Sequence, residues 1–295
     1  MRPVALRGRH CIRVPRSVKG AHERAWHGDK NRDSYLFSFT VLLLRVMLPC
    51  CMPRTARIVV PGWPHHVTQR GNNRQTVFFT EEDRSLYLRV FGAQCRRHGV
   101  VVLGYCLMGN HVHHVLVPRR PEALARAMGR THLIYAQYLN RRRRRSGHVW
   151  QNRFFSAAFE WPHLPAVMRY AECNPLRARL CRSAAAYRWS SAAAHCGRRD
   201  VSGLLDLKRW RRFVDCQAWP TMLNEPLDPR QVELIRARTH TGRPMAGPDA
   251  LAKLEAVLGF RLHTLPRGRP PKKRRAIMNE GAASGARDVE PIRQK

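Results

Sequence analysis

The sequence "GNHVHHVLV", residues 109–117, carries three histidines within four positions and then becomes apolar. The stretch before it, "VVVLGYCLM" at residues 100–108, is apolar throughout and is typical of a buried strand. Gly109 and Asn110 between them suit a tight connection, so the two segments predict a β-hairpin.

The three histidines of this hairpin fall on two faces of the predicted strand. Successive side chains of a strand point to opposite faces, so His111 and His113 share one face and His114 lies on the other. Two imidazoles at this spacing lie about 6–7 Å apart and can converge on one metal ion. The alternative is a half-exposed strand whose histidines bind nothing, and the motif alone leaves both interpretations open.

Further elements are expected on either side of the hairpin. They are a strand at 65–70, a helix between a Thr80 cap and Gly99, a helix over 121–144, a strand at 152–160, and a helix over 163–174 that Pro175 ends. The order β-α-β-β-α-β-α is typical of the split βαβ arrangement. We therefore predict an α+β fold, with a ferredoxin-like antiparallel sheet and helices on one face.

The charge of the chain points to a polyanionic partner. Lys and Arg number 54 against 20 Asp and Glu, which gives a formal net charge of +34. GC-rich codons would also enrich arginine, but they do not account for the scarcity of acidic residues. The balance therefore predicts a nucleic-acid partner.

The cysteines and the apolar stretches exclude other classes of protein. The nine cysteines include no Cys-x-x-Cys pair, which argues against a zinc ribbon and against a disulfide framework and favours a reducing cytoplasm. The stretch from Tyr35 to Pro49 is too short to span a bilayer and contains Arg45. We therefore expect no membrane insertion and a cytoplasmic, nucleoid-associated protein.

Changes in composition divide the chain into four parts. Residues 1–51 are basic and irregular and read as a poorly ordered extension, with Met52 as a candidate initiator. Residues 52–196 hold the α+β domain. Residues 197–262 predict a small helical, DNA-binding-like region with two helices around a Gly-Pro turn. Residues 263–295 form a basic tail that cannot build a core and is expected to be disordered.

Four segments together carry a resemblance to a known family. They are "MPRTARIVVPGWPHHVTQRGNNRQTVFF", "GYCLMGNHVHHVLVP", "LNRRRRRSGHVWQNRFFS" and "RYAECNPLRARL". Their order and spacing resemble the REP-associated tyrosine transposases, which belong to the single-tyrosine HUH transposases with an IS200-like domain. The doubled His113-His114 departs from the usual pattern, but His114 is expected to face away from the pair. Residues 1–51 have no recognised counterpart.

The resemblance implies a metal-dependent tyrosine nickase and transposase that cleaves and rejoins single-stranded DNA. Tyr170 would attack a phosphorus, forming a 5′-phosphotyrosine and releasing a 3′-hydroxyl. His111, His113 and Asn174 would hold Mg²⁺ or Mn²⁺. Because ligand imidazoles must be neutral, activity should fall at acid pH.

Two alternatives to this enzyme remain open. A non-catalytic protein could keep the fold and bind hairpin DNA as a regulator. An unrelated metal hydrolase could use the histidine pair, although no acidic ligand lies near the motif. An intact His111, His113 and Tyr170 favour the enzyme, because a protein that only binds DNA would not need all three.

Several residues are candidates for contacts with single-stranded or hairpin DNA. Arg70, Arg153 and Arg177 lie in the matching segments and could bind phosphates, with a solvated surface as the alternative. Trp150 and Phe154 could stack on unpaired bases, although packing in the core is the stronger interpretation for both.

The basic tail holds a further candidate for DNA binding. "RGRPP" at residues 267–271 resembles an AT-hook, in which Arg267 and Arg269 would enter a minor groove. The alternative is a tail that adds only non-specific affinity. Nothing in the sequence decides between a monomer and a homodimer.

Overall fold

A computed structural model of the protein describes residues 57–262. The predictions that lie outside the described residues are those for 1–51, for Tyr35 to Pro49, for Met52, and for the tail 263–295 with Arg267 and Arg269. Within residues 57–262, no helix is both long enough and apolar enough to cross a membrane.

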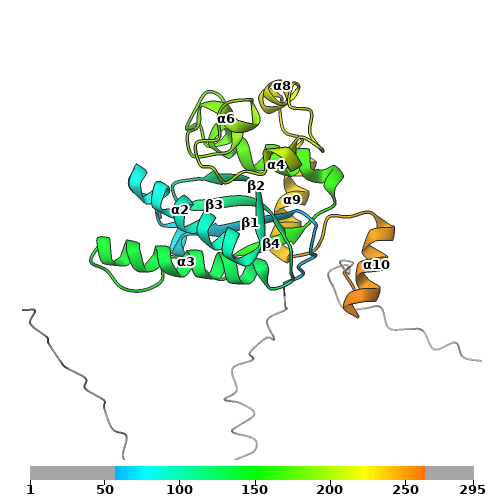
Figure 1. The fold of residues 1–295 in the computed structure, drawn as a ribbon, viewed down its shortest axis with the longest axis horizontal. Helices are drawn as coiled ribbons and strands as arrows, with labels where there is room; N and C mark the ends of the chain where they lie inside the picture. The colour runs from blue at the N-terminus through cyan, green and yellow to red at the C-terminus, as the bar shows by residue number, and fades with distance from the viewer. Residues whose placement is uncertain (1–56, 263–295) are drawn as a thin grey trace, which may run out of the picture. The chain divides into compact units, whose positions relative to one another are not determined.

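A four-stranded antiparallel sheet forms the centre of the fold (Figure 1). Its strands are β1 (His65–Arg70), β2 (Val100–Leu107), β3 (His111–Pro118) and β4 (Phe155–Ala158). The spatial order is β2-β3-β1-β4, and each neighbouring pair is antiparallel. This is the split βαβ arrangement, so the predicted α+β fold class is confirmed.

The helices of the described residues vary widely in length. The α-helices are α2 (Glu81–His98), α3 (Ala123–Arg142), α4 (Leu164–Glu172), α5 (Asn174–Arg177), α6 (Ala192–His195), α7 (Leu207–Trp210), α8 (Trp219–Asn224), α9 (Pro229–Thr241) and α10 (Pro248–Leu258). Three short 3-10 turns accompany them, at η1 (Asn72–Arg74), η2 (Trp161–His163) and η3 (Ala184–Ala186).

Local sequence signals set both ends of α2 where they were predicted. Thr80 accepts a hydrogen bond from the backbone N–H of Asp83, and the Asp83 carboxylate accepts from the backbone N–H of Thr80. This reciprocal capping box satisfies donors that the first helical turn would otherwise leave free. Gly99 ends the helix at φ 67°, a left-handed conformation that glycine adopts without a steric penalty.

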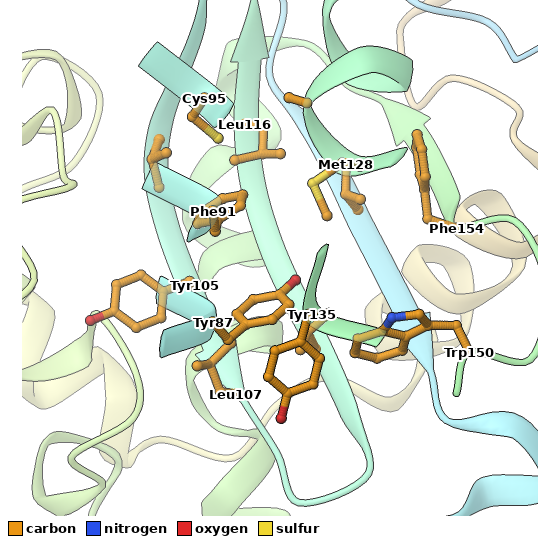
Figure 2. Packing of buried hydrophobic residues seen from close by; sticks show 14 of the residues in the cluster. Tyr87, Phe91, Cys95, Tyr105, Leu107, Leu116, Met128, Tyr135, Trp150 and Phe154 are labelled. Atoms are coloured by element: carbon orange, nitrogen blue, oxygen red, sulfur yellow. The ribbon is translucent and has the colours of Figure 1, made fainter. Parts of the chain in front are cut away.

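One hydrophobic core lies between the sheet and the two crossover helices, α2 and α3. Tyr87 and Phe91 of α2 and Tyr135 of α3 are fully buried there beside Leu116 of β3 (Figure 2). His114 also faces this core, where its ring stacks on Phe91 at 4.3 Å between centroids. The crossover helices therefore share one face of the sheet, and His114 lies on the face opposite to the histidine pair, as predicted.

Further helices cover the other face of the sheet, which the sequence pattern did not reveal. Figure 1 shows α4, α6 and α8 on the side of the sheet opposite α3. Val115 and Val117 of β3 share a second core with Met168 of α4 and Ile235 of α9. Successive side chains of β3 therefore point into two different cores, and the helix that carries Tyr170 packs in the second.

A buried carboxylate ties α4 to the helices that follow it. Glu172 is fully buried, and its Oε1 accepts hydrogen bonds from the Ser191 hydroxyl and from His195 Nδ1. Its Oε2 accepts from Trp219 Nε1 at 3.1 Å. Because a buried carboxylate is costly unless its oxygens are satisfied, these three donors hold α4 at a defined position.

The predicted helix stop at Asn174 differs slightly from the structure. α4 ends at Glu172, and Asn174 opens the short α5 with Pro175 at its second position. Proline is accepted there because the first turn of a helix has no partner for its N–H groups. The Asn174 side-chain amide donates to the carbonyl of Tyr170 at 2.9 Å, which keeps the two side chains close together.

Residues 197–262 contain the two expected helices: α9 contacts the sheet, and Leu251 of α10 lies in a separate small cluster with Ile58 and Leu262. Trp210, Trp219 and Ile235 share the second core with Tyr170. Helix α9 therefore packs against the helices that cover the second face of the sheet.

The segment after α9 also covers an edge of the sheet. Met245 donates its N–H to the carbonyl of Ala158 and accepts from the N–H of Glu160, at 2.9 and 3.0 Å. The Gly247 N–H donates to the Glu160 carboxylate at 2.7 Å. These bonds occupy backbone groups that the edge strand β4 would otherwise expose.

Buried histidines make the stability of this fold dependent on pH. Burial lowers the pKa of His65 to about 4 and that of His132 to about 3. Between pH 6.5 and these values the unfolded chain binds protons that the folded chain does not. Each histidine should therefore reduce the free energy of unfolding by up to about 1.4 kcal/mol per pH unit as the pH falls below 6.5.

Urea unfolding between pH 7.5 and 5.0 measures this effect. The variant His65→Gln should show a shallower loss of stability with falling pH than the unchanged protein, since one titrating group is removed. Equal free energies of unfolding at both ends of this range would contradict the assignment.

Candidate functional site

A cavity of about 510 Å³ opens on the face of the sheet that carries the histidine pair. Residues from β1, β3, β4, α4, α5 and α9 contribute to its wall. The lining residues are His66, Thr68, Gln69, Arg70, Arg74, His111, His113, Gln151, Phe155, Tyr170, Asn174, Arg236, Thr239 and His240. The cavity therefore contains five of the residues that the sequence singled out, namely Arg70, His111, His113, Tyr170 and Asn174.

The histidine pair and the tyrosine lie beside one another in this cavity. The rings of His111 and His113 have centroids 5.0 Å apart. The ring of Tyr170 stands edge-on to that of His113, with 5.7 Å between centroids. The Tyr170 ring on α4 thus lies on the same side of the sheet as both imidazoles and in contact with that of His113.

His111 is oriented by the turn that precedes it. The Asn110 amide nitrogen donates to the carbonyl of Arg74 at 3.1 Å, so the amide oxygen faces His111. That oxygen lies 2.6 Å from His111 Nδ1 and accepts a hydrogen bond from it. Because the proton is then on Nδ1, Nε2 of His111 keeps a lone pair for a metal ion.

His113 is buried and is held by a second histidine that the sequence analysis did not single out. Its Nδ1 lies 3.0 Å from Nε2 of His66, and Nδ1 of His66 lies 2.7 Å from the Thr239 hydroxyl. Burial lowers the pKa of His66 to about 3 and that of His113 well below its ordinary value. Both rings are therefore neutral at neutral pH.

Arg177 connects the tyrosine and the asparagine. Its guanidinium carbon lies 4.5 Å from the centroid of the Tyr170 ring, and its Nη2 donates to Asn174 Oδ1 at 2.7 Å. A cation over the ring stabilises the negative charge that the ring carries once the hydroxyl proton leaves. Partial burial lowers the pKa of Arg177, but an arginine stays charged at neutral pH.

The chemistry of these donors fits a divalent cation with an incomplete set of protein ligands. Among residues 57–262, no three His, Cys, Asp or Glu side chains are placed to hold a metal ion. Two imidazole nitrogens are available, and the Asn174 oxygen has a second lone pair beside its bond from Arg177. Imidazole favours Mn²⁺ over Mg²⁺, while an amide oxygen suits both.

The electrostatic character of the cavity favours an anion. Arg70, Arg74 and Arg236 line it, and no described residue in its lining is acidic. Burial and then the charges of Arg70 and Arg177 lower the pKa of His111 to about 4. A phosphodiester would therefore enter a cationic cavity and could complete the ligand set of a metal bound there.

Two predicted stacking residues lie in the core instead of the cavity. Trp150 and Phe154 are only 8% and 6% exposed, and Figure 2 shows both among the packed aromatic side chains. Trp150 Nε1 donates to the carbonyl of His132, and the Arg57 guanidinium covers the Phe154 ring at 3.8 Å. Neither ring presents a free face to a base, which corrects the stacking prediction and leaves the core interpretation.

The neighbouring Phe155 lies in the cavity, where Phe154 was expected to act. Its ring is partly exposed and stacks on His240 of α9 at 4.8 Å. Alternation along β4 explains the difference, since adjacent residues face opposite sides of the sheet. The doubled "FF" gave no signal for which ring faces the cavity.

The predicted phosphate-binding arginines occupy three different positions. Arg70 lines the cavity, and Arg177 contacts the two side chains described above. Arg153 is exposed but does not line the cavity. Arg74 and Arg236 line the cavity without having been predicted.

Comparison with known proteins agrees with the four motifs. Residues 60–174 match the family described as "Transposase IS200 like". Residues 60–174 are therefore similar to IS200-like transposases, in agreement with the resemblance that the motifs carry. The matched region ends at Asn174, so α9 lies outside it.

Among solved structures, the chain is similar to a REP-associated tyrosine transposase bound to a REP hairpin, at 16% identity and a TM-score of 0.42. That match covers 53% of this chain and 90% of the other. No curated protein matches the chain.

The two neighbouring phenylalanines provide a matched test of the cavity. Phe155→Ala should weaken binding of a single-stranded oligonucleotide by about 5- to 150-fold, the range for loss of one stacked base. Phe154→Leu should lower the free energy of unfolding by up to about 1.5 kcal/mol and leave DNA affinity unchanged. Fluorescence anisotropy and urea unfolding measure the two effects, and the reverse pattern would show that Phe155 does not contact DNA.

Proposed function

We propose that this protein cleaves and rejoins single-stranded DNA through a covalent bond to Tyr170. The observation that carries the proposal is the position of the Tyr170 ring, 5.7 Å between centroids from His113 in a cavity without acidic residues in its described lining. The IS200-like family match over the same residues supports it.

The chemistry follows from the groups around the phenol. The Tyr170 oxygen would form a bond to a backbone phosphorus while the bond from that phosphorus to the 3′-oxygen breaks. The products are a 5′-phosphotyrosine and a 3′-hydroxyl, which takes up a proton. Because the phosphodiester energy is kept, a 3′-hydroxyl can reverse the step without ATP.

The cationic side chains bind and orient the phosphate in this scheme. Arg70, Arg74 and Arg236 attract the backbone into the cavity, and Arg177 stabilises the charge on the phenol. His111, His113 and Asn174 would hold Mg²⁺ or Mn²⁺. Such an ion polarises the scissile phosphate and stabilises charge on the leaving oxygen.

The substrate that we propose is a single strand that carries a hairpin. The four segments that resemble REP-associated transposases support this choice, and the net charge of +34 fits DNA in general. Tyr170 and both imidazoles of one chain lie in the same cavity, so we propose that the step takes place within a single chain.

A covalent adduct tests the proposal directly. The protein should be incubated with Mn²⁺ and a single-stranded hairpin oligonucleotide labelled on the strand 3′ of the cleavage site. A denaturing gel should show a labelled protein band. The band should be absent with Tyr170→Phe and absent when EDTA is present during the incubation. Tyr170→Phe removes only a hydroxyl, so its DNA affinity should stay within about twofold of the unchanged protein.

The outcome that contradicts the enzyme is tight binding of several hairpins with neither adduct nor cleavage. That result would favour the non-catalytic DNA-binding protein. An adduct that persists in Tyr170→Phe would instead place the nucleophile elsewhere in the chain.

The three proposed metal ligands should differ in importance. His111→Ala should abolish adduct formation at millimolar Mn²⁺, because one of two imidazole ligands is lost. Asn174→Ala should only raise the Mn²⁺ concentration needed, since water can replace an amide oxygen. Titration of adduct yield against Mn²⁺ measures both effects. An unchanged Mn²⁺ requirement in Asn174→Ala would remove this residue from the ligand set.

A further inference from the structure

A buried chain of hydrogen bonds leads from α9 to the histidine pair. It runs from Thr239 of α9 to His66 of β1 and on to His113 of β3, through contacts of 2.7 and 3.0 Å. All three residues are at most 4% exposed, so water does not compete for these bonds. The direction of the protons along this chain decides which nitrogen of His113 is free.

Helix α9 fixes the direction in which the Thr239 hydroxyl, the first group of these hydrogen bonds, donates its proton. The Thr239 hydroxyl oxygen lies 2.6 Å from the carbonyl oxygen of Ile235, one turn earlier in α9. Two oxygens at that distance need a hydrogen between them, and only the hydroxyl can supply one. Thr239 therefore donates to Ile235, and only its lone pairs face His66.

The other two protons follow from the first. Because Thr239 offers a lone pair, His66 must carry its proton on Nδ1 and donate to the hydroxyl oxygen. A neutral His66 then has a lone pair on Nε2, so His113 donates to it from Nδ1. Nε2 of His113 is left unprotonated, as is Nε2 of His111 through its bond to Asn110.

We propose that His66 and Thr239 are positioning residues that set the tautomer and ring orientation of His113 for metal binding. The inference rests on the proposed function, because it assigns a role toward the ion that His111 and His113 would hold. It adds to the site a residue of α9, a helix that lies beyond residues 60–174, the region that matches the family. Helix α9 is then part of the active site.

Removal of the Thr239 hydroxyl should reverse the direction of the hydrogen bond between His66 and His113. In Thr239→Val the shape is kept, but Nδ1–H of His66 loses its acceptor. His66 then gains by moving its proton to Nε2, where it can donate to His113. That donation requires a lone pair on Nδ1 of His113 and a proton on Nε2, which blocks the nitrogen that would bind the metal.

Metal affinity is the first readout. Mn²⁺ binding to the full-length protein, followed by electron paramagnetic resonance, should weaken about 10- to 100-fold in Thr239→Val. Thr239→Ser keeps the hydroxyl and should bind Mn²⁺ within about twofold of the unchanged protein. Equal affinity in Thr239→Val, or equal loss in Thr239→Ser, would overturn the proposal.

A second readout reports the tautomer of His113 in the unchanged protein directly. In metal-free protein labelled with ¹⁵N-histidine, His113 should give the nitrogen shifts of the Nδ1–H form, with the signal assigned through His113→Gln. A signal from the Nε2–H form in the unchanged protein would overturn the proposal, even if Thr239→Val failed to fold.

The two proposals can fail separately. If the unchanged protein forms the Tyr170 adduct while Thr239→Val binds Mn²⁺ normally, the role of Thr239 fails and the proposed function stands. If the predicted shifts and affinities are found but no hairpin gives an adduct, the tautomer assignment stands and the proposed function fails.

Discussion

The antiparallel pairing of β1 with β3 is the constraint on which the site depends. In this register Arg70 lies opposite His111 and Thr68 lies opposite His113. His66 is opposite Val115, which makes it a diagonal neighbour of His113 on the same face. A shift of the β1–β3 register by one residue would turn the imidazoles toward the core under α2 and α3. The site therefore forms only in the observed register.

The opposite face of the sheet is covered by large side chains that are packed in the first core. Tyr87, Phe91 and Tyr135 are fully buried there (Figure 2). Their packing against the sheet stabilises the register between β1 and β3. On the cavity side, α4 is held by the buried Glu172 and its three donors. The position of Tyr170 relative to the imidazoles is thus set by the two cores, the second of which includes the Tyr170 ring, and by the polar network around Glu172.

Much of this could be predicted from the sequence where the signals are local. The hairpin, the Thr80 cap and the Gly99 stop follow from neighbouring residues, and alternation along β3 separates His114 from the pair. His66 and Thr239 could not be found in this way, because 173 positions separate them and their contact depends on how α9 packs. Phe155 was missed for a different reason, since a run of two phenylalanines does not show which ring faces the cavity.

The central claim is that two imidazole Nε2 atoms beside Tyr170 bind one cation. Anomalous diffraction from a crystal of the full chain soaked in Mn²⁺ tests it most directly. The account predicts a single manganese peak in the cavity, bonded to Nε2 of both His111 and His113. A peak bonded through Nδ1 of either ring, or a cavity without manganese when the histidines are unprotonated, would contradict it.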